Sequence, residues 1–313
     1  MQIRNFTVES DFDGLPLSCA AYEPDSPPAG IFQIVHGMCE HKKRYDEFMR
    51  FLAENGFVAA AHDHRGHGDS VRSDADLGWF HDKTGEAAIN DAVQVTRELK
   101  KMYPGLPVLL FGHSMGSMVV RCYIQKHDGE IDALVVCGSP SKNPLAGAGV
   151  ALAKTIAAFR GDRYRSPLLA WLSTGNGDEK FPGEGKGAWL SHNRENIDAY
   201  NADPKSDFFF TCNGFENLFR FMKHTYAKGR YAVSNPDLPI YFVSGSDDAV
   251  LINEDKWLAA QQMLRDVGYK NVSGRLWHGM RHEILNEIGR EEVYADLLAF
   301  ARKTLGGKAE QSR

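Results

Sequence analysis

Cysteines are few in this sequence, and their arrangement fits neither a metal site nor a disulfide framework. The 313 residues contain five cysteines, an odd number, and no two of them form a C-x-x-C pair. This pattern argues against a zinc ribbon and against the disulfide-stabilised fold of a small secreted domain. A reducing compartment suits such a chain, so we expect a cytoplasmic location.

Long apolar runs and an excess of positive charge are also missing. No window approaches 18 consecutive apolar residues, and residues 1–14 lack the apolar segment of a signal peptide, so we expect neither a membrane span nor a signal peptide. The formal net charge of −5 provides no basic field for a phosphate backbone, which argues against a nucleic-acid partner. With 43% hydrophobic and 25% charged residues, the composition is that of a globular protein.

Apolar runs of strand length alternate with helical patterns along the chain. Buried parallel strands are indicated at residues 31–35, 57–61, 108–111 and 133–137. Helices are indicated between them at residues 44–55 and 86–103. After an interruption the pattern returns, with strands at 240–243 and 272–277, a helix around 257–264 and a last helix at about 286–305. We therefore expect an α/β fold with a mostly parallel central sheet flanked by helices.

The interruption, residues 141–232, differs in composition from the rest of the chain. It contains 13 Lys or Arg against 9 Asp or Glu, a balance of +4, which leaves the remainder at −9. We expect a core made of residues 1–140 and 233–313, with residues 141–232 inserted as a cap, and transient contact between this basic cap and a membrane surface. Its aromatic residues either pack only as the cap's own core or line an apolar slot, for which the candidates are Phe210, Phe215 and Phe219.

A G-x-S-x-G pentapeptide occupies residues 112–116. It directly follows the apolar run 108–111 and precedes residues 117–123, which have helix length and an apolar face, so its serine would lie on a sharp strand-to-helix turn. Such a turn needs Gly112 and Gly116, because neighbouring backbone leaves no room for a Cβ there. The pattern predicts Ser114 as a nucleophile at the positive end of a helix; the alternative is an ordinary serine N-cap.

A nucleophilic serine needs a base, and the base needs a carboxylate that fixes its tautomer. In this type of fold the order along the chain is Ser, Asp, His. An acidic pair, Asp247-Asp248, follows the strand at 240–243, and two histidines, His278 and His282, follow the strand at 272–277. Both order and spacing fit this arrangement. We favour Asp248 and His282, and we interpret Asp247 as a solvated turn residue or helix cap and His278 as a structural histidine at a strand end.

The tetrahedral oxyanion of acyl transfer needs backbone N–H donors. His36-Gly37, after the first interior strand, resembles the H-G loop that supplies one donor, while the residue after the nucleophile supplies the other. The candidate donors are therefore Met38 and Met115. We expect His36 to brace this loop by hydrogen bonding.

Several motifs spread over nearly the whole chain occur together. They are His36-Gly37 with Glu40-His41 and Arg44-Tyr45, Asp63-His64-Arg65-Gly66-His67-Gly68, Gly112-His113-Ser114-Met115-Gly116, Gly245-Ser246-Asp247-Asp248, and His282-Glu283 with Asn286-Glu287. In these motifs the chain resembles the serine α/β-hydrolases of the monoacylglycerol lipase and lysophospholipase group. The resemblance implies an α/β-hydrolase fold with a mobile cap, no cofactor, and hydrolysis of esters with one long acyl chain. It makes Ser114 the nucleophile, Asp248 the acid, His282 the base, and Met38 and Met115 the oxyanion donors.

Other functions stay open. A small-ester carboxylesterase or an acyltransferase would use the same triad. His62, His64 and His67 satisfy H-x-H-x-x-H, a metal-binding signature of zinc metallohydrolases, but Gly66 stands where the second metal's carboxylate would be and the flanking pattern predicts a parallel sheet. A third alternative is a non-catalytic receptor that keeps the fold as a ligand pocket.

Overall fold

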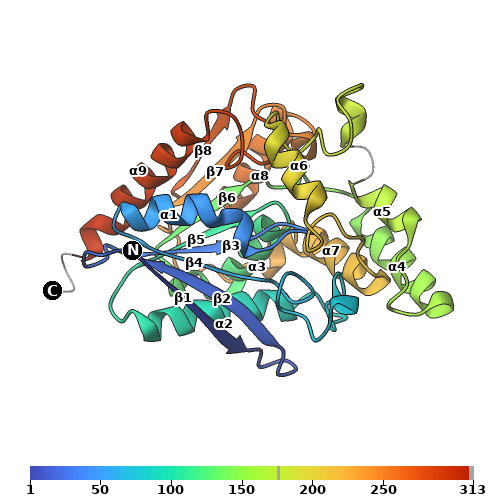
Figure 1. The fold of residues 1–313 in the computed structure, drawn as a ribbon, viewed down its shortest axis with the longest axis horizontal. Helices are drawn as coiled ribbons and strands as arrows, with labels where there is room; N and C mark the ends of the chain where they lie inside the picture. The colour runs from blue at the N-terminus through green and yellow to red at the C-terminus, as the bar shows by residue number, and fades with distance from the viewer. Residues whose placement is uncertain (175–176, 310–313) are drawn as a thin grey trace.

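An eight-stranded sheet forms the centre of the structure, a computed structural model that describes residues 1–174 and 177–309 (Figure 1). The strand order is β1-β2-β4-β3-β5-β6-β7-β8. β1 and β2 join antiparallel, β2 meets β4 antiparallel, and every other neighbouring pair is parallel. The strand bounds are β1 Gln2–Glu9, β2 Pro16–Glu23, β3 Ile31–Val35, β4 Val58–His62, β5 Val108–His113, β6 Ala133–Cys137, β7 Ile240–Gly245 and β8 Val272–Trp277.

Alternate side chains of the interior strands enter two separate apolar cores. In β5, Val108 and Leu110 belong to one core, while Leu109 and Phe111 belong to the other. The first core is completed by α2 (Ala87–Met102), α3 (Met115–His127) and α8 (Glu254–Asp266), and the second by α1 (Asp46–Glu54) and α9 (Arg290–Ala309). The sheet is thus covered by helices on both faces, which explains why its interior strands are continuously apolar.

Four helices are inserted between β6 and β7 and lie together on one side of the molecule (Figure 1). They are α4 (Ala146–Arg160), α5 (Pro167–Thr174), α6 (Arg194–Ala202) and α7 (Cys212–Thr225). The insertion therefore falls where the sequence pattern is interrupted, after one parallel strand and before the next. The division into a core and a cap at residues 141 and 232 stays a prediction.

The α/β prediction is confirmed, with two differences. The sequence pattern missed β1 and β2. Most β1 side chains are exposed and its residues carry no apolar run, whereas β2 is mostly buried and was also missed. The last helix begins at Arg290, later than expected, because residues 283–289 form turns that place Glu283 and Glu287 in buried hydrogen bonds.

The described residues contain no helix long and apolar enough to cross a membrane. All five cysteines lie within these residues, and each is a buried free thiol.

Candidate active site

Ser114 occupies a strained turn between β5 and α3. Its φ of 53° and ψ of −115° lie outside the regions that a non-glycine residue normally adopts. The Ser114 N–H donates to the carbonyl of Cys137 on β6 over 2.9 Å, which fixes the turn against the neighbouring strand. Strain of this kind persists only where the surroundings hold it, and it is typical of a nucleophile presented at the top of a sheet.

Glycines make this turn possible, as the sequence indicated. A Cβ at Gly116 would lie 2.1 Å from the carbonyl oxygen of Val35 and 2.5 Å from that of His36. A Cβ at Gly112 would lie 2.5 Å from the Gly116 carbonyl oxygen. The start of α3 therefore packs directly on the backbone that follows β3, and this contact brings residues 36–38 next to Ser114.

Asp248 and His282 meet at the same edge of the sheet. Both carboxylate oxygens of Asp248 lie 3.0 Å from Nδ1 of His282, and both side chains are almost fully buried. Asp248 also accepts from the Ser244 hydroxyl over 2.8 Å and from the Val250 N–H over 2.9 Å. Burial favours the neutral carboxyl, but the charge and hydrogen bond of the imidazole outweigh it, so the pKa of Asp248 is held below its ordinary value.

Burial distinguishes the two members of each candidate pair, Asp247 and Asp248, and His278 and His282. Asp247 and His278 are exposed, and the Asp247 carboxylate accepts from the neighbouring Ser246 hydroxyl over 2.7 Å. Asp248 follows β7 and His282 follows β8, so both stand at the carboxyl ends of parallel strands, as does Ser114 after β5. No hydrogen bond joins Ser114 to the His282 ring in the described part of the chain. The residue before Ser114 does approach the imidazole, since the ring of His113 lies 4.7 Å from that of His282.

Two backbone donors flank Ser114. In residues 1–174 and 177–309, neither the Met38 N–H nor the Met115 N–H finds an acceptor. Met115 is the first residue of α3, so its N–H also lies at the positive end of the helix dipole. Gly37 brings the other donor close, since a Cβ on it would stand 3.2 Å from Ser114 Cβ. This arrangement suits a developing oxyanion.

A buried polar network ties these loops together, and sequence reasoning did not identify it. The Glu40 carboxylate accepts from the Gly37 N–H (2.5 Å), the Tyr45 hydroxyl (2.8 Å), Arg44 (2.9 Å) and His113 Nδ1 (3.3 Å). His113 Nε2 lies 3.2 Å from the carbonyl oxygen of His282. Both ring nitrogens of His113 therefore face acceptors, an arrangement in which only the imidazolium could donate from both nitrogens.

The charge of that ring depends on Glu40. Burial opposes the charged imidazole, but the hydrogen bond and negative charge of Glu40 outweigh burial and raise the pKa of His113. The same Arg44 that contacts Glu40 also binds Glu283 through two hydrogen bonds of 2.6 and 2.8 Å. Glu40, Arg44 and Glu283 all lie in the motifs quoted from the sequence. That they contact one another could be recognised only from the folded structure.

The H-x-H-x-x-H segment forms a structural cluster. Its His64 Nε2 lies 3.1 Å from the carbonyl oxygen of His36, and His67 Nδ1 lies 3.1 Å from that of Arg65. His62, His64 and His67 are fully buried, and burial lowers the pKa of His62 and of His67 to about 4. Within the described ranges, no three His, Cys, Asp or Glu side chains are placed to hold a metal ion. The expected bracing role of His36 fits its acceptance of the His64 N–H over 2.9 Å.

The candidate slot residues are packed inside the protein. Phe210 and Phe215 have ring centroids 5.7 Å apart, and Phe219 packs on α4, where a Cβ at Gly149 would lie 2.8 Å from its ring. Phe215 and Phe219 lie on α7 and Phe210 lies just before it, and all three side chains are buried in the first apolar core. Their role in binding an acyl chain stays a prediction.

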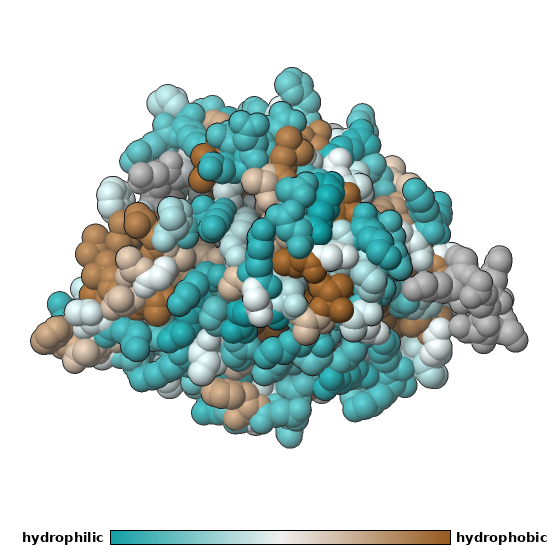
Figure 2. All heavy atoms as spheres, turned by 180° about the vertical axis from the view of Figure 1, so that it is seen from behind, coloured by the Kyte–Doolittle hydropathy of each residue, from teal (hydrophilic) through white to brown (hydrophobic). Residues whose placement is uncertain are grey.

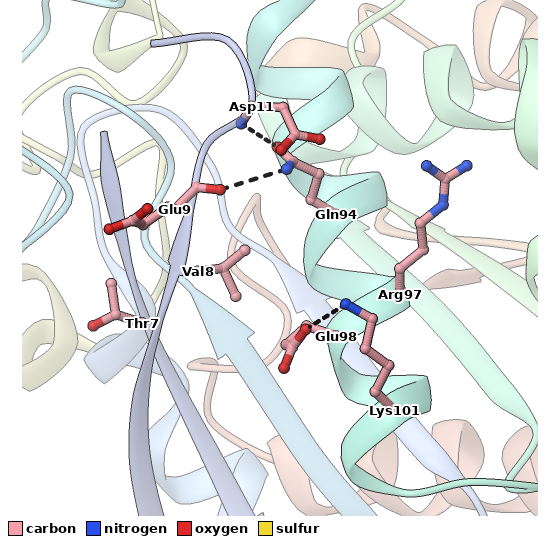
Figure 3. Close-up of a pocket in the computed structure, with 8 residues that line it drawn as sticks. All are labelled: Thr7, Val8, Glu9, Asp11, Gln94, Arg97, Glu98 and Lys101. Atoms are coloured by element: carbon pink, nitrogen blue, oxygen red, sulfur yellow. Dashed lines mark hydrogen bonds and ion pairs between the residues drawn. The ribbon is translucent and has the colours of Figure 1, made fainter. Parts of the chain in front are cut away.

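A surface groove of about 360 Å³ lies away from this site, between β1 and α2 (Figure 3). Gln94 spans it, accepting from the Asp11 N–H and donating to the Glu9 carbonyl, and Lys101 pairs with Glu98. Arg97, which also lines the groove, pairs with Glu130 outside it, and the groove contains none of the candidate catalytic residues.

The sheet order, the inserted helices and the Ser114 turn define an α/β-hydrolase. The chain belongs to the Hydrolase_4 family, described as serine aminopeptidase S33, which matches residues 26–289.

The chain is 31% identical to human monoglyceride lipase over 61% of its length and 57% of that protein, and 26% identical to monoacylglycerol lipase of Mycolicibacterium smegmatis over 92% and 93%. It is also similar to the crystal structure of a thermostable carboxyl esterase from Bacillus coagulans in complex with glycerol, with a TM-score of 0.89, 26% identity and coverage of 97% of this chain and 99% of that one. The resemblance to the monoacylglycerol lipase group is confirmed.

Proposed function

We propose that this chain is a serine hydrolase that cleaves carboxylic esters through an acyl-enzyme on Ser114. The observation that carries the proposal is the buried Asp248–His282 pair, which stands at the same sheet edge as the strained Ser114 turn. The names of the relatives, two lipases of monoacylglycerols and a carboxyl esterase, support the class of reaction.

The proposed reaction assigns one step to each group. His282 takes the proton of the Ser114 hydroxyl as its oxygen attacks the ester carbonyl, and Asp248 stabilises the imidazolium through Nδ1. The Met38 and Met115 N–H groups stabilise the oxyanion. The imidazolium then gives its proton to the leaving alcohol, and water releases the acid from Ser114 in the reverse sequence of proton transfers.

We assign mono-acyl lipids, monoacylglycerols or lysophospholipids, as the substrates. In this proposal residues 141–232 act as a cap, and Phe210, Phe215 and Phe219 line a slot that holds one acyl chain. Each further buried methylene would then contribute about 0.8 kcal/mol. A small-ester carboxylesterase or an acyltransferase would use the same triad with a shorter slot or another acceptor alcohol.

A panel of p-nitrophenyl and glyceryl esters of increasing chain length tests this assignment. We expect kcat/KM to rise about three- to fourfold per added methylene until the slot is full, and mono-acyl substrates to be preferred to di- and triacyl ones. Phe219→Ala should flatten the rise, whereas Phe209→Ala should not, because Phe209 is an exposed cap aromatic. A wild-type profile that is flat or falling beyond butyryl esters would leave a small-ester carboxylesterase.

The proposed contact with membranes rests on the exposed face of α4 and α5. Figure 2 shows a hydrophobic patch on the side of the molecule where these helices lie. Phe159 is 83% exposed and Trp171 56%, and Lys154 and Arg160 are exposed on the same helix as Phe159. Apolar side chains flanked by cations suit an anionic lipid surface.

Sedimentation with anionic phosphatidylglycerol vesicles tests the contact. Phe159→Ser should reduce the bound fraction, and Leu258→Ser should leave it unchanged, since Leu258 is also an exposed apolar residue of a helix, at 45%, but lies on α8. Equal binding by both variants would contradict a cap-mediated contact.

A further inference from the structure

Trp189 covers the catalytic imidazole proposed above. Its ring centroid lies 4.9 Å from that of His282, and the two planes are tilted by 35°. Trp189 belongs to the segment between α5 and α6, which is far from the triad in sequence, and its side chain is half-buried. An inserted segment thus supplies one wall of the site directly.

Neighbouring residues of the same segment hold Trp189 in place. The Asp178 carboxylate accepts from the backbone N–H of Trp189 over 3.1 Å and from the backbone N–H of Gly187 over 3.0 Å, which fixes the backbone that carries the indole. Gly177 packs on the ring, because a Cβ there would lie only 2.7 Å from Trp189 Cγ. Any larger residue at position 177 would collide with the indole and displace it, so the observed position of the ring requires glycine there.

The whole segment is fastened to the loop that carries His282. Arg281 donates to the carbonyl of Ala188 over 2.7 Å, and the Glu283 N–H donates to the carbonyl of Leu190 over 2.8 Å. Arg281 is 3% exposed and its guanidinium also lies 3.7 Å from the centre of the Phe181 ring. Residues on both sides of His282 are therefore bonded to residues on both sides of Trp189, so the two rings keep their contact if other parts of the cap move.

Three groups surround the imidazole. Asp248 binds Nδ1, the ring of His113 lies 4.7 Å away with its own Nδ1 toward Glu40, and the uncharged indole of Trp189 lies 4.9 Å away. The face of an indole carries negative electrostatic potential and attracts a cation within about 6 Å of its centre. In the proposed reaction His282 becomes such a cation only after it takes the Ser114 proton.

We infer that Trp189 is a positioning residue that holds the ring of His282 and stabilises the imidazolium formed during acyl transfer. The inference rests on the proposed function, since it requires His282 to be the base. Interactions of this strength correspond to a change of about two- to thirtyfold in rate. Because the interaction grows as the proton is transferred, the effect should fall on kcat as well as on kcat/KM.

The test compares Trp189→Phe and Trp189→Leu on a short soluble ester, p-nitrophenyl butyrate, across pH. Leucine covers the imidazole without a π face, so Trp189→Leu should lower kcat about two- to thirtyfold and move the acid limb of the kcat/KM profile to lower pH, because the protonated ring is less stabilised. Trp189→Phe should lie between wild type and Trp189→Leu. The matched control, Phe209→Leu, should leave both quantities unchanged.

Circular dichroism and the melting temperature establish whether each variant folds. Should Trp189→Leu not fold, the inference is tested by the smaller shift of the acid limb that we expect for Trp189→Phe. Equal rates for the two variants, with an unmoved acid limb, would overturn the inference and leave Trp189 as a packing residue. His282→Asn separates the two proposals. If it abolishes turnover while Trp189→Leu matches Trp189→Phe, only the role of Trp189 fails; if it keeps turnover, the proposed base fails and the role of Trp189 with it.

Discussion

Gly116→Ala tests the packing that holds the nucleophile turn. The added methyl would stand 2.1 Å from the carbonyl oxygen of Val35 and 2.5 Å from that of His36, whereas contacts under 3.0 Å essentially never occur. Both neighbours are backbone atoms and cannot rotate away. The start of α3 and the segment after β3 must therefore separate by roughly 1 Å.

That separation would displace the two proposed oxyanion donors from each other, because Met115 lies on α3 and Met38 follows β3. Donors act over a narrow range of about 2.7–3.1 Å, and loss of one typically costs about 10²- to 10³-fold in kcat. We expect Gly116→Ala to lower kcat by about 10² or more, and to lower the melting temperature as well, since overpacking typically costs about 1–3 kcal/mol.

The assay is hydrolysis of p-nitrophenyl butyrate, with folding followed by circular dichroism. Gly147→Ala is the control: it also places alanine in a helix, but outside its own helix backbone nothing lies within 4 Å of the new methyl, so activity should be unchanged and stability should not fall. A Gly116→Ala protein with activity within threefold of wild type and an unchanged melting temperature would refute the reasoning.

Two further predictions concern the acid and the buried histidines. Asp248→Asn should lower kcat by about 10⁴-fold while Asp247→Asn changes it little, because only Asp248 touches the imidazole; steady-state kinetics with equal losses would show that the acidic pair is misassigned. Urea unfolding should reveal a loss of stability on acidification, since the pKa of His62 and of His67 is about 4 in the folded protein against about 6.5 when unfolded. The unfolded chain then binds more protons, so stability is complete above about pH 6.5 and falls by up to about 1.4 kcal/mol per pH unit for each histidine down to about pH 4. A urea midpoint that stays constant from pH 7 to pH 5 would contradict this.

The parts of the fold that depend on runs of consecutive residues could be predicted from the sequence. The apolar run before Ser114 became β5, and the two glycines around the serine are required by backbone atoms, as the pentapeptide indicated. β1 escaped prediction because it is an edge strand with mostly exposed side chains, so neither a continuous apolar run nor a clear alternation marks it.

The candidate site, too, could be predicted only in part from the sequence. Order along the chain pointed to the acidic pair and to the two histidines, and the family resemblance assigned Asp248 and His282. Only the fold shows that these two are buried while Asp247 and His278 are exposed. The position of Trp189 had no local signal at all, because it depends on hydrogen bonds between the inserted segment and residues around position 282. Contacts between segments so distant in sequence leave no periodic pattern to detect.

Labelling with a fluorophosphonate probe, followed by mass spectrometry of the modified peptide, tests most directly that Ser114 is the nucleophile. We predict one label, on Ser114, and we expect Ser114→Ala to lose both the label and several orders of magnitude of ester turnover while Ser246→Ala, an exposed serine at the same edge of the sheet, keeps both. A label on another residue, or labelling and turnover that persist in Ser114→Ala, would contradict the account.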